Sequence, residues 1–304
     1  MIKPLWGIDL GGTKIEGVVL EPGSELKILS RLRLPTEAQK GYAHVVEQIT
    51  RLVQLLETET GLKPNVIGIG TPGSLDPVTH LLKNSNTTCL NKQPLQKDLE
   101  AALGVPVIIS NDANCFALAE THLGIMPEVM PQAAVVIGLI LGTGVGSGIV
   151  VNGKVLTGRQ GIAGEWGHNF LDESGGPCYC GRTGCVETII SGSALQRYYT
   201  QLSGQQLPLK VILEKYQTGN DTFAQQTIQR LLHFFGKSVA VLVNILDPDA
   251  IVVGGGVGNI NLLYDEGVAA VKKYVFNTNP DILLLKPKLG DSAGVFGAAM
   301  LTVE

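Results

Sequence analysis

The 304-residue chain lacks an excess of positive charge: its 23 lysines and arginines stand against 27 aspartates and glutamates, for a formal net charge of −4. A nucleic-acid-binding protein needs a cationic surface that displaces the counterions of the phosphates, so this balance argues against that class. The chain also shows no export signal, because Asp9 stands where the apolar core of a signal peptide would run. We therefore expect a cytoplasmic protein with neither a nucleic-acid nor a membrane partner.

The sequence also predicts no membrane-spanning helix. The longest uncharged stretch, Ala133–Val151, approaches the length of a span but contains five glycines, and glycine at this density breaks helices. We expect a strand, a turn and a second strand there.

Two common phosphate-binding motifs are absent. A P-loop ending at Gly236-Lys237-Ser238 would need glycine at position 231, which is leucine, and a G-x-G-x-x-G fingerprint would need glycine at Ser147 or Asn259. Glycine itself is abundant, with 38 residues, or about one in eight against a usual ~7%. A glycine turn after a strand can expose its N–H groups to a phosphate, although a single such turn is also typical of a plain hairpin.

The length suggests two domains at ~150 residues each, and the order of elements predicts mixed sheets with helices packed on them. Helices are predicted at Tyr42–Thr60, Leu95–Leu103, Ala113–Leu123, within Ser191–Leu246 and at Gly294–Leu301. Strands are predicted at Leu5–Leu10, Ile15–Leu20, Leu26–Leu34, Val66–Gly70, Val105–Ser110 and Ala250–Val253. We expect two of these strands, Val66–Gly70 and Val105–Ser110, to be buried.

The first strand–turn–strand unit recurs at an offset of 131 residues, where Trp6–Val19 aligns with Ile137–Val150 over fourteen positions. Gly11 then matches Gly142, which predicts two similarly built halves. Asp9 has Ile140 as its counterpart. Only the first hairpin carries a carboxylate, as expected if one turn holds a metal ion and the other only phosphate.

Two further segments carry polar groups with chemical potential. Asn111-Asp112-Ala113-Asn114 lies between a predicted strand and a predicted helix, where it could be a helix cap or place a catalytic carboxylate at the end of a strand. His168 with Cys178, Cys180 and Cys185 offers the four N and S ligands of a closed, structural zinc site, against the alternative of reduced cysteines in a loop. Glu165 and Glu187 flank these ligands, and we expect them to face a polyhydroxylated ligand.

Taken together, these motifs make the chain resemble the ROK family (repressor, open reading frame, kinase), whose sugar kinases have the actin-like ATPase, ribonuclease H-like fold. The resemblance runs nearly end to end through Asp9–Thr13, Asn111–Asn114, Glu165–His168, Cys178–Glu187 and Gly254–Gly256. It implies an α/β protein of two similar lobes that close on a cleft, each with a mixed sheet flanked by helices. We expect a small lobe over 1–118, on which a helix at about 290–304 packs, and a large lobe over 119–289 with a zinc-binding insertion at 161–187.

The resemblance also implies roles for individual residues in the transfer of a phosphoryl group from ATP. Asp112 would be the general base, Asp9 would hold Mg²⁺, and His168 with the three cysteines would hold zinc, with the second ring nitrogen of His168 facing the sugar. The expected sugar-binding residues are Gly73, Asn86, Asn111, Asp112, Glu165, His168 and Glu187. The expected ATP-binding residues are Asp9, Gly11, Gly12, Thr13, Lys14, Gly142, Thr143, Gly144, Gly254, Gly255 and Gly256.

The identity of the sugar is the open point. The segment Lys83–Leu95 is similar to ROK fructokinases, which favours the 6-hydroxyl of fructose, or of mannose or glucose, while Asn111–Glu120 and Gly138–Gly148 are equally similar to N-acetylglucosamine kinases. A kinase of N-acetylglucosamine or N-acetylmannosamine is the alternative. A sugar-responsive ROK transcriptional regulator is the alternative from another class, but we expect no room for a DNA-binding domain before Asp9. We expect a homodimer.

Overall fold

The computed structural model describes residues 3–23 and 26–303, which form two compact units. Unit 1 comprises Met1–Gln132, Gly148–Ala163 and Lys288–Glu304, and unit 2 comprises Ala133–Ser147 and Gly164–Pro287, in each case for the described residues. Residues 1 and 304, the outer limits of the lobes expected from the sequence, lie outside the described residues. The lobe boundaries themselves remain a prediction.

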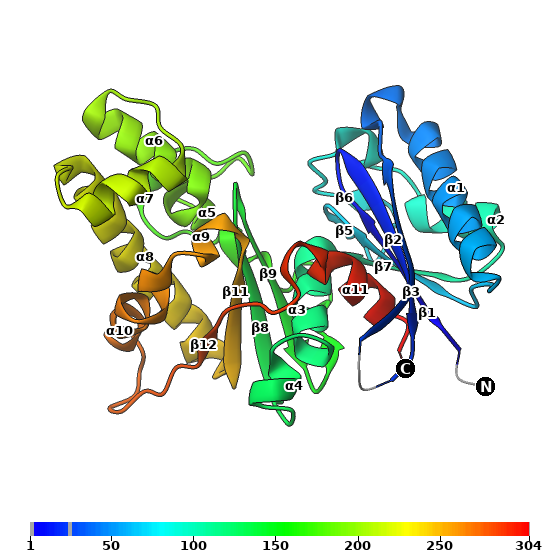
Figure 1. Cartoon of the computed structure of the whole chain (residues 1–304). Coiled ribbons are helices and arrows are strands. Elements are labelled where there is room, and N and C mark those ends of the chain that lie inside the picture. Colours follow the sequence, from blue (N-terminus) through cyan, green and yellow to red (C-terminus); the bar gives the residue numbers. More distant parts are fainter. Residues whose placement is uncertain (1–2, 24–25, 304) are drawn as a thin grey trace. The chain divides into compact units, whose positions relative to one another are not determined.

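The sheet of unit 1 has five strands in the order β3-β2-β1-β4-β7 (Figure 1). Strand β2 runs antiparallel to β1 and β3, whereas β4 is parallel to β1 and β7 is parallel to β4, so the sheet is mixed as predicted. A separate two-stranded hairpin joins β5 and β6. The strands are β1 (Leu5–Leu10), β2 (Lys14–Glu21), β3 (Lys27–Pro35), β4 (Ile67–Thr71), β5 (Ser74–Leu75), β6 (Leu82–Lys83) and β7 (Val107–Asn111).

Helices cover the two faces of this sheet. The apolar stripe of α1, which includes Leu52 and Leu56, packs with Trp6 and Ile8 in the core, and α1 ends at Gly61 in the left-handed conformation with φ of 68°. Its predicted bounds are confirmed. The helices of unit 1 are α1 (Tyr42–Thr60), α2 (Leu95–Leu103), α3 (Asp112–His122), α4 (Met126–Val129) and α11 (Ala293–Met300).

Glycines in the strands let the helices approach the sheet closely. A side chain at Gly7 would collide with the backbone of α11 at Val295 and Ala299, while one at Gly17, on the opposite face, would reach Leu56 of α1 at 2.8 Å. The abundance of glycine therefore serves packing as well as turns, a role that the sequence interpretation did not give it.

The interpretation of Val105–Ser110 as a buried strand is wrong in part. Strand β7 lies at the edge of the sheet, and Ile108 keeps 40% of its surface exposed. An edge strand has a neighbour on one side only, so an apolar run does not ensure burial there. Strand β4, which lies between two strands, is buried throughout its length as predicted.

The second sheet repeats the plan of the first, with the order β10-β9-β8-β11-β12. In the first sheet, β1 lies between β2, which follows the glycine turn, and the parallel strand β4. In the second sheet, β8 lies in the same way between β9 and the parallel strand β11. This equivalence confirms the internal repeat, and the strand–turn–strand interpretation of Ala133–Val151 is also confirmed. The strands are β8 (Val135–Leu141), β9 (Val145–Val151), β10 (Lys154–Val155), β11 (Ala250–Gly254) and β12 (Leu284–Leu285).

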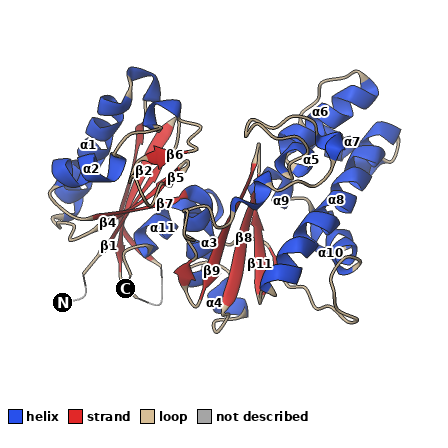
Figure 2. Ribbon diagram, turned by 180° about the vertical axis from the view of Figure 1, so that it is seen from behind, coloured by secondary structure: helices blue, strands red, loops and turns tan. Residues whose placement is uncertain are grey.

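The core of unit 2 lies between β8, β11 and the long helix α8, which contributes Leu231, Phe235 and Val239. Figure 2 shows α8 and α10 side by side near the strands β8 and β11, and Gly236 of α8 lies against Ala270 of α10. The helices are α5 (Glu187–Ile190), α6 (Gly192–Ser203), α7 (Leu209–Thr218), α8 (Thr222–Leu246), α9 (Gly255–Gly258) and α10 (Glu266–Lys272).

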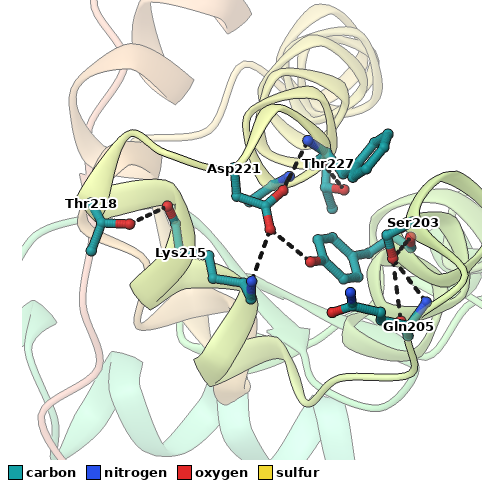
Figure 3. A network of polar contacts seen from close by, with 9 residues as sticks. Ser203, Gln205, Lys215, Thr218, Asp221 and Thr227 are labelled. Carbon is teal, nitrogen blue, oxygen red and sulfur yellow. Dashed lines mark hydrogen bonds and ion pairs between the residues drawn. The ribbon is translucent and has the colours of Figure 1, made fainter.

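Asp221 forms polar contacts with residues of the three helices α6, α7 and α8 (Figure 3). One carboxylate oxygen accepts hydrogen bonds from the amides of Phe223 and Ala224 and caps α8, while the other accepts from the hydroxyl of the buried Tyr199 at 2.8 Å and pairs with Lys215 at 3.1 Å. Hydrogen bonding from the Ala224 amide, with the help of Tyr199 and Lys215, lowers the pKa of Asp221 to about 2. The charged form is therefore the one that stabilises this corner.

The chain returns to unit 1 beside α3. Glu120, fully buried in that helix, accepts hydrogen bonds from the amides of Ile125, Lys288 and Leu289 at 2.9–3.0 Å. These bonds place α11 against α3, where a side chain at Gly297 would collide with the carbonyl of Cys115. Within the described residues, none of the helices combines the length and apolar character that a membrane crossing requires.

Candidate active site

The first glycine turn joins β1 to β2 in unit 1. The amide of Gly11 donates to the carbonyl of Lys14 at 3.0 Å and closes the turn, and the hydroxyl of Thr36 donates to the carbonyl of Gly11 at 2.6 Å. Gly12, Thr13 and Lys14 are exposed. The turn therefore presents backbone and side chains to solvent on a fixed frame, as a phosphate-binding turn must.

Asp9 lies in β1 just before this turn and is partly buried. Burial, together with repulsion from Asp112 and Glu16, raises the pKa of Asp9 from 3.8 to about 6, against the opposing effect of Lys14. Glu16 itself is buried and pairs with Arg31 and Arg33. A carboxylate with a raised pKa among other acids is a group that gains from a nearby cation.

The segment from β7 to α3 contains both features that the sequence offered as alternatives, a helix cap and a carboxylate at the end of a strand. Asn111 is buried and caps the helix, since its side-chain oxygen accepts from the amide of Asn114 at 2.7 Å. Asp112 follows as the first residue of α3 and accepts from the amide of Ala113 at 2.8 Å. Asp112 is exposed, but desolvation by the protein around its carboxylate raises its pKa against the opposing effect of the Ala113 amide.

Two more predicted residues of unit 1 lie on neighbouring segments. Gly73 has φ of 91°, and a side chain there would come within 2.9 Å of the amide of Ser85. Asn86 follows Ser85 and is exposed. A side chain at Gly12 would in turn reach the hydroxyl of Thr87 at 3.3 Å. The segment at 85–87 therefore lies close to both Gly73 and the first glycine turn.

The second glycine turn joins β8 to β9 in unit 2. The amide of Gly142 donates to the carbonyl of Gly144 at 3.0 Å, and the amide of Gly192 donates to the carbonyl of Gly142 at 2.7 Å. Thr143 at the tip is exposed. This turn carries no carboxylate of its own, as the alignment of Asp9 with Ile140 predicts.

The third glycine run, Gly254–Gly256, begins at the end of β11 and leads into α9. Gly255 has φ of 82°, and a side chain there would approach the amide of Gly142 at 2.9 Å. Gly255 and Gly256 are exposed. The predicted nucleoside-side glycines thus lie directly beside the second glycine turn.

The structure gathers the four predicted zinc ligands into one cluster. The ligand atoms of His168, Cys178, Cys180 and Cys185 all lie within 4.8 Å of one another, and the cysteines are free thiols. The sulfurs of Cys180 and Cys185 are 3.6 Å apart, and Nδ1 of His168 is 3.5 Å from the sulfur of Cys178. Two thiolates bound to one tetrahedral zinc at ~2.3 Å lie ~3.8 Å apart, so the donor set fits zinc in kind and in spacing.

The second ring nitrogen of His168 has a protein partner. Its Nε2 lies 2.9 Å from the hydroxyl of Tyr179, and the two rings meet edge to face with centroids 5.0 Å apart. This is the position in which a metal-bound imidazole usually has a hydrogen-bond partner. Sequence reasoning missed Tyr179, although its place between Cys178 and Cys180 was a signal for it.

The two flanking glutamates differ in their surroundings. Glu165 begins a short 3₁₀ helix that ends at His168 and is partly exposed. Glu187 begins α5, and its Oε2 accepts from the amide of Val145 at 3.0 Å. Sequence reasoning also missed Thr36 and Gly192, which form hydrogen bonds with the glycine turns, and Thr87, which lies close to Gly12. No short motif marks a residue that comes from a distant segment.

Comparison with known proteins identifies the chain. The model of the ROK family matches residues 5–304. The chain belongs to the ROK family. The resemblance to ROK family sugar kinases and the α/β, actin-like ATPase fold with two similar, mixed-sheet halves are thereby confirmed.

Three of the most similar proteins span this chain almost completely. An N-acetyl-D-glucosamine kinase of Pasteurella multocida is 35% identical over 307 residues, with 97% of this chain and 98% of that protein covered. The crystal structure of a ROK hexokinase from Thermus thermophilus has 33% identity and a TM-score of 0.87, covering 98% of this chain and 97% of the other. A ROK family glucokinase from Streptomyces griseus in complex with glucose and AMPPNP has 29% identity and a TM-score of 0.76, with 98% of both chains covered.

Proposed function

We propose that this ROK protein is an ATP-dependent sugar kinase that phosphorylates an N-acetylhexosamine, with N-acetylglucosamine first, on its 6-hydroxyl. The observation that carries the proposal is end-to-end similarity to N-acetylglucosamine kinases: further relatives with 33% to 36% identity carry that name. We therefore place N-acetylhexosamines ahead of fructose, which the segment Lys83–Leu95 favoured. Glucose is the second candidate, because a ROK hexokinase and a glucokinase with bound glucose are also similar to this chain.

Asp112 is the general base in this proposal. Its carboxylate stands at the start of α3, and its raised pKa increases its affinity for a proton. It takes the proton of the 6-hydroxyl as that oxygen attacks the γ-phosphoryl group. Asn111 uses its side-chain oxygen for the helix cap, which leaves its amide group as a donor to a sugar oxygen.

The glycine turns act on the phosphates. Phosphoryl transfer depends mainly on alignment and on stabilisation of charge by positioned donors. Gly11, Gly12, Thr13 and Lys14 on one turn and Gly142, Thr143 and Gly144 on the other supply backbone amides and side chains for this, and Gly254–Gly256 borders the nucleoside. Mg²⁺ bound with ATP neutralises part of the phosphate charge, and Asp9 would hold it.

The zinc cluster has a structural role in the proposal. Four protein ligands leave no open position for a water, so the ion would not take part in the reaction. His168, Cys178, Cys180 and Cys185 would instead fix the loop between Glu165 and Glu187, the two carboxylates that we assign to sugar hydroxyls. Gly73 and Asn86 complete the assigned sugar-binding residues.

An ADP-release assay across N-acetylglucosamine, N-acetylmannosamine, glucose, mannose and fructose tests the proposal. We expect the highest kcat/KM for N-acetylglucosamine, and Asp112→Ala is the control for background ATPase activity. Highest efficiency with fructose would return the assignment to the first expectation, and no sugar-dependent ADP release would overturn the kinase. Specific binding of DNA in a gel-shift assay would instead support the alternative of a transcriptional regulator. The homodimer and the cytoplasmic location stay predictions.

A further inference from the structure

Gly144 of the second glycine turn lies against a carboxylate of its own chain. A Cβ atom at Gly144 would stand 2.6 Å from Oε2 of Glu187 and 3.4 Å from its carboxyl carbon. The same oxygen accepts the hydrogen bond from the amide of Val145 at 3.0 Å. The space that the missing side chain leaves is therefore occupied by Glu187.

Gly142, two residues earlier in the same turn, has a different environment. A Cβ atom there would meet no protein atom within 4 Å. Neither glycine has a positive φ in the range that disfavours other residues. Backbone conformation thus explains neither glycine: Gly142 leaves open space beside the turn, whereas Gly144 leaves room for a charged side chain.

Glu187 also belongs to the segment that carries the thiol cluster. It follows the predicted zinc ligand Cys185 by two residues, and the segment continues to Gly192, whose amide donates to the carbonyl of Gly142 at 2.7 Å. One short segment, 185–192, is thus attached to the cluster at its start and to the second glycine turn through Glu187 and Gly192.

We propose that Glu187 is a positioning residue for the second glycine turn and couples the binding of sugar to the binding of ATP. The proposal rests on the proposed function, which assigns Glu187 to the sugar and this turn to the phosphates. Oε2 is held by the Val145 amide, so Oε1 is the atom that accepts from a sugar hydroxyl. A sugar that orders Glu187 thereby orders the turn, and by reciprocity a nucleotide on the turn raises the affinity for sugar.

Substitution of the two glycines distinguishes an effect that passes through Glu187 from a general effect of altering the phosphate-binding turn. Gly144→Ala places a methyl carbon 2.6 Å from Oε2, which is too close for both atoms to stay, and the flexible end of Glu187 must move away. We expect isothermal titration calorimetry without nucleotide to show a loss of about tenfold in affinity for N-acetylglucosamine, the size of one hydrogen bond to a charged group. Gly142→Ala, the matched control in the same turn, should keep its sugar affinity within about twofold, because its methyl group meets no protein atom.

Glu187→Ala adds a readout that the loss of a sugar contact alone would not move. We expect this variant to bind ATP more weakly with no sugar present, because the amide of Val145, directly after the turn, loses the carboxylate that accepts its hydrogen bond. In the Glu187→Ala background, Gly144→Ala should cause no further loss of sugar affinity, since the group that it displaces is gone. Equal melting temperatures of the variants and the unsubstituted protein show that the fold is intact.

Three results would overturn the coupling. The first is a sugar affinity of Gly144→Ala equal to that of the unsubstituted protein, and the second is an equal effect of Gly144→Ala with and without Glu187. The third is unchanged ATP affinity in Glu187→Ala. Failure of the proposed function is recognised separately, because the unsubstituted protein would then bind no N-acetylglucosamine, whereas the three results above concern a protein that does bind it.

Discussion

Replacement of Asp9 by asparagine should have opposite effects on stability and on metal use. Asp9 is partly buried at the end of β1, and its pKa is raised from 3.8 to about 6 by burial and by repulsion from Asp112 and Glu16. The fold therefore disfavours the charge of Asp9, and the role that we assign to this charge is to hold Mg²⁺. Asp9→Asn removes the charge and keeps nearly the same shape.

The sign of the stability effect follows from the two pKa values. Well below pH 3.8 the carboxyl group is protonated in both the folded and the unfolded protein, so it contributes no difference. As the pH rises from 3.8 through about 6, the unfolded chain ionises first and the folded state loses stability relative to it. A difference from 3.8 to about 6 corresponds to ~3 kcal/mol at full ionisation, and partial contact with solvent reduces the expected gain of Asp9→Asn to about 1–3 kcal/mol at pH 7.5.

Urea unfolding of the protein without Mg²⁺ or ATP, at pH 4.5 and pH 7.5, measures this effect. We expect Asp9→Asn to be the more stable protein at pH 7.5, with the gain reduced to roughly a third at pH 4.5. Glu59→Gln, which removes an exposed carboxylate from α1, is the matched control and should change the free energy of unfolding by less than about 0.5 kcal/mol. The kinase assay should show that Asp9→Asn needs more Mg²⁺.

The reasoning fails if Asp9→Asn is less stable than the unsubstituted protein at pH 7.5. It also fails if the gain is the same at both pH values, because an ionisation cannot then be its source. Unchanged dependence of the activity on Mg²⁺ would remove Asp9 as the metal residue, whatever its effect on stability.

Three further predictions concern the base, the metal and the helical corner. Asp112→Ala should lower kcat by about 10²–10⁴-fold with sugar affinity by calorimetry nearly retained; near-normal turnover would exclude Asp112 as the base. Cys180→Ser should lower the zinc content and the melting temperature, and Tyr179→Phe should weaken zinc binding by roughly tenfold in a chelator competition; full zinc affinity in both variants would contradict the assigned ligand set. Asp221→Ala should lower the free energy of unfolding by about 1–2 kcal/mol in urea, because α8 loses its cap, and an unchanged midpoint would show that the cap adds nothing.

Much of the fold could be predicted because local patterns and global packing agree. Helix α1 has its apolar residues at helical spacing and a glycine at its end, and the observed bounds Tyr42–Thr60 are the predicted ones. The repeat of the glycine hairpin at an offset of 131 residues anticipated two sheets of equivalent strand order. Strand β7 was misjudged, since a run of apolar residues does not reveal which strand lies at a sheet edge.

The short elements could not be predicted, for a physical reason. Strands β10 and β12 have two residues each, too few for any periodicity, and they exist because a longer neighbour offers its edge. The supports of the glycine turns have the same origin. Thr36 and Gly192 act through backbone contacts with distant segments, which a sequence motif does not record.

The cluster of His168 and the cysteines was predictable because the residue types limit the chemistry. The two contacts of the neighbouring side chains were not: Tyr179 at Nε2 of His168 and the Val145 amide at Glu187 depend on how the loop folds. These contacts change the interpretation of the site, since His168 and Glu187, two of the predicted sugar ligands, also have a partner within the protein.

The most direct test of the central claim is ³¹P NMR of the protein with Mg²⁺, ATP and N-acetylglucosamine. We predict that the γ-phosphate signal of ATP is replaced by the signal of a sugar 6-phosphate monoester in amounts equal to the ADP formed, and that this does not occur with Asp112→Ala. Inorganic phosphate as the sole product, or a faster conversion of fructose or glucose under the same conditions, would contradict the assignment.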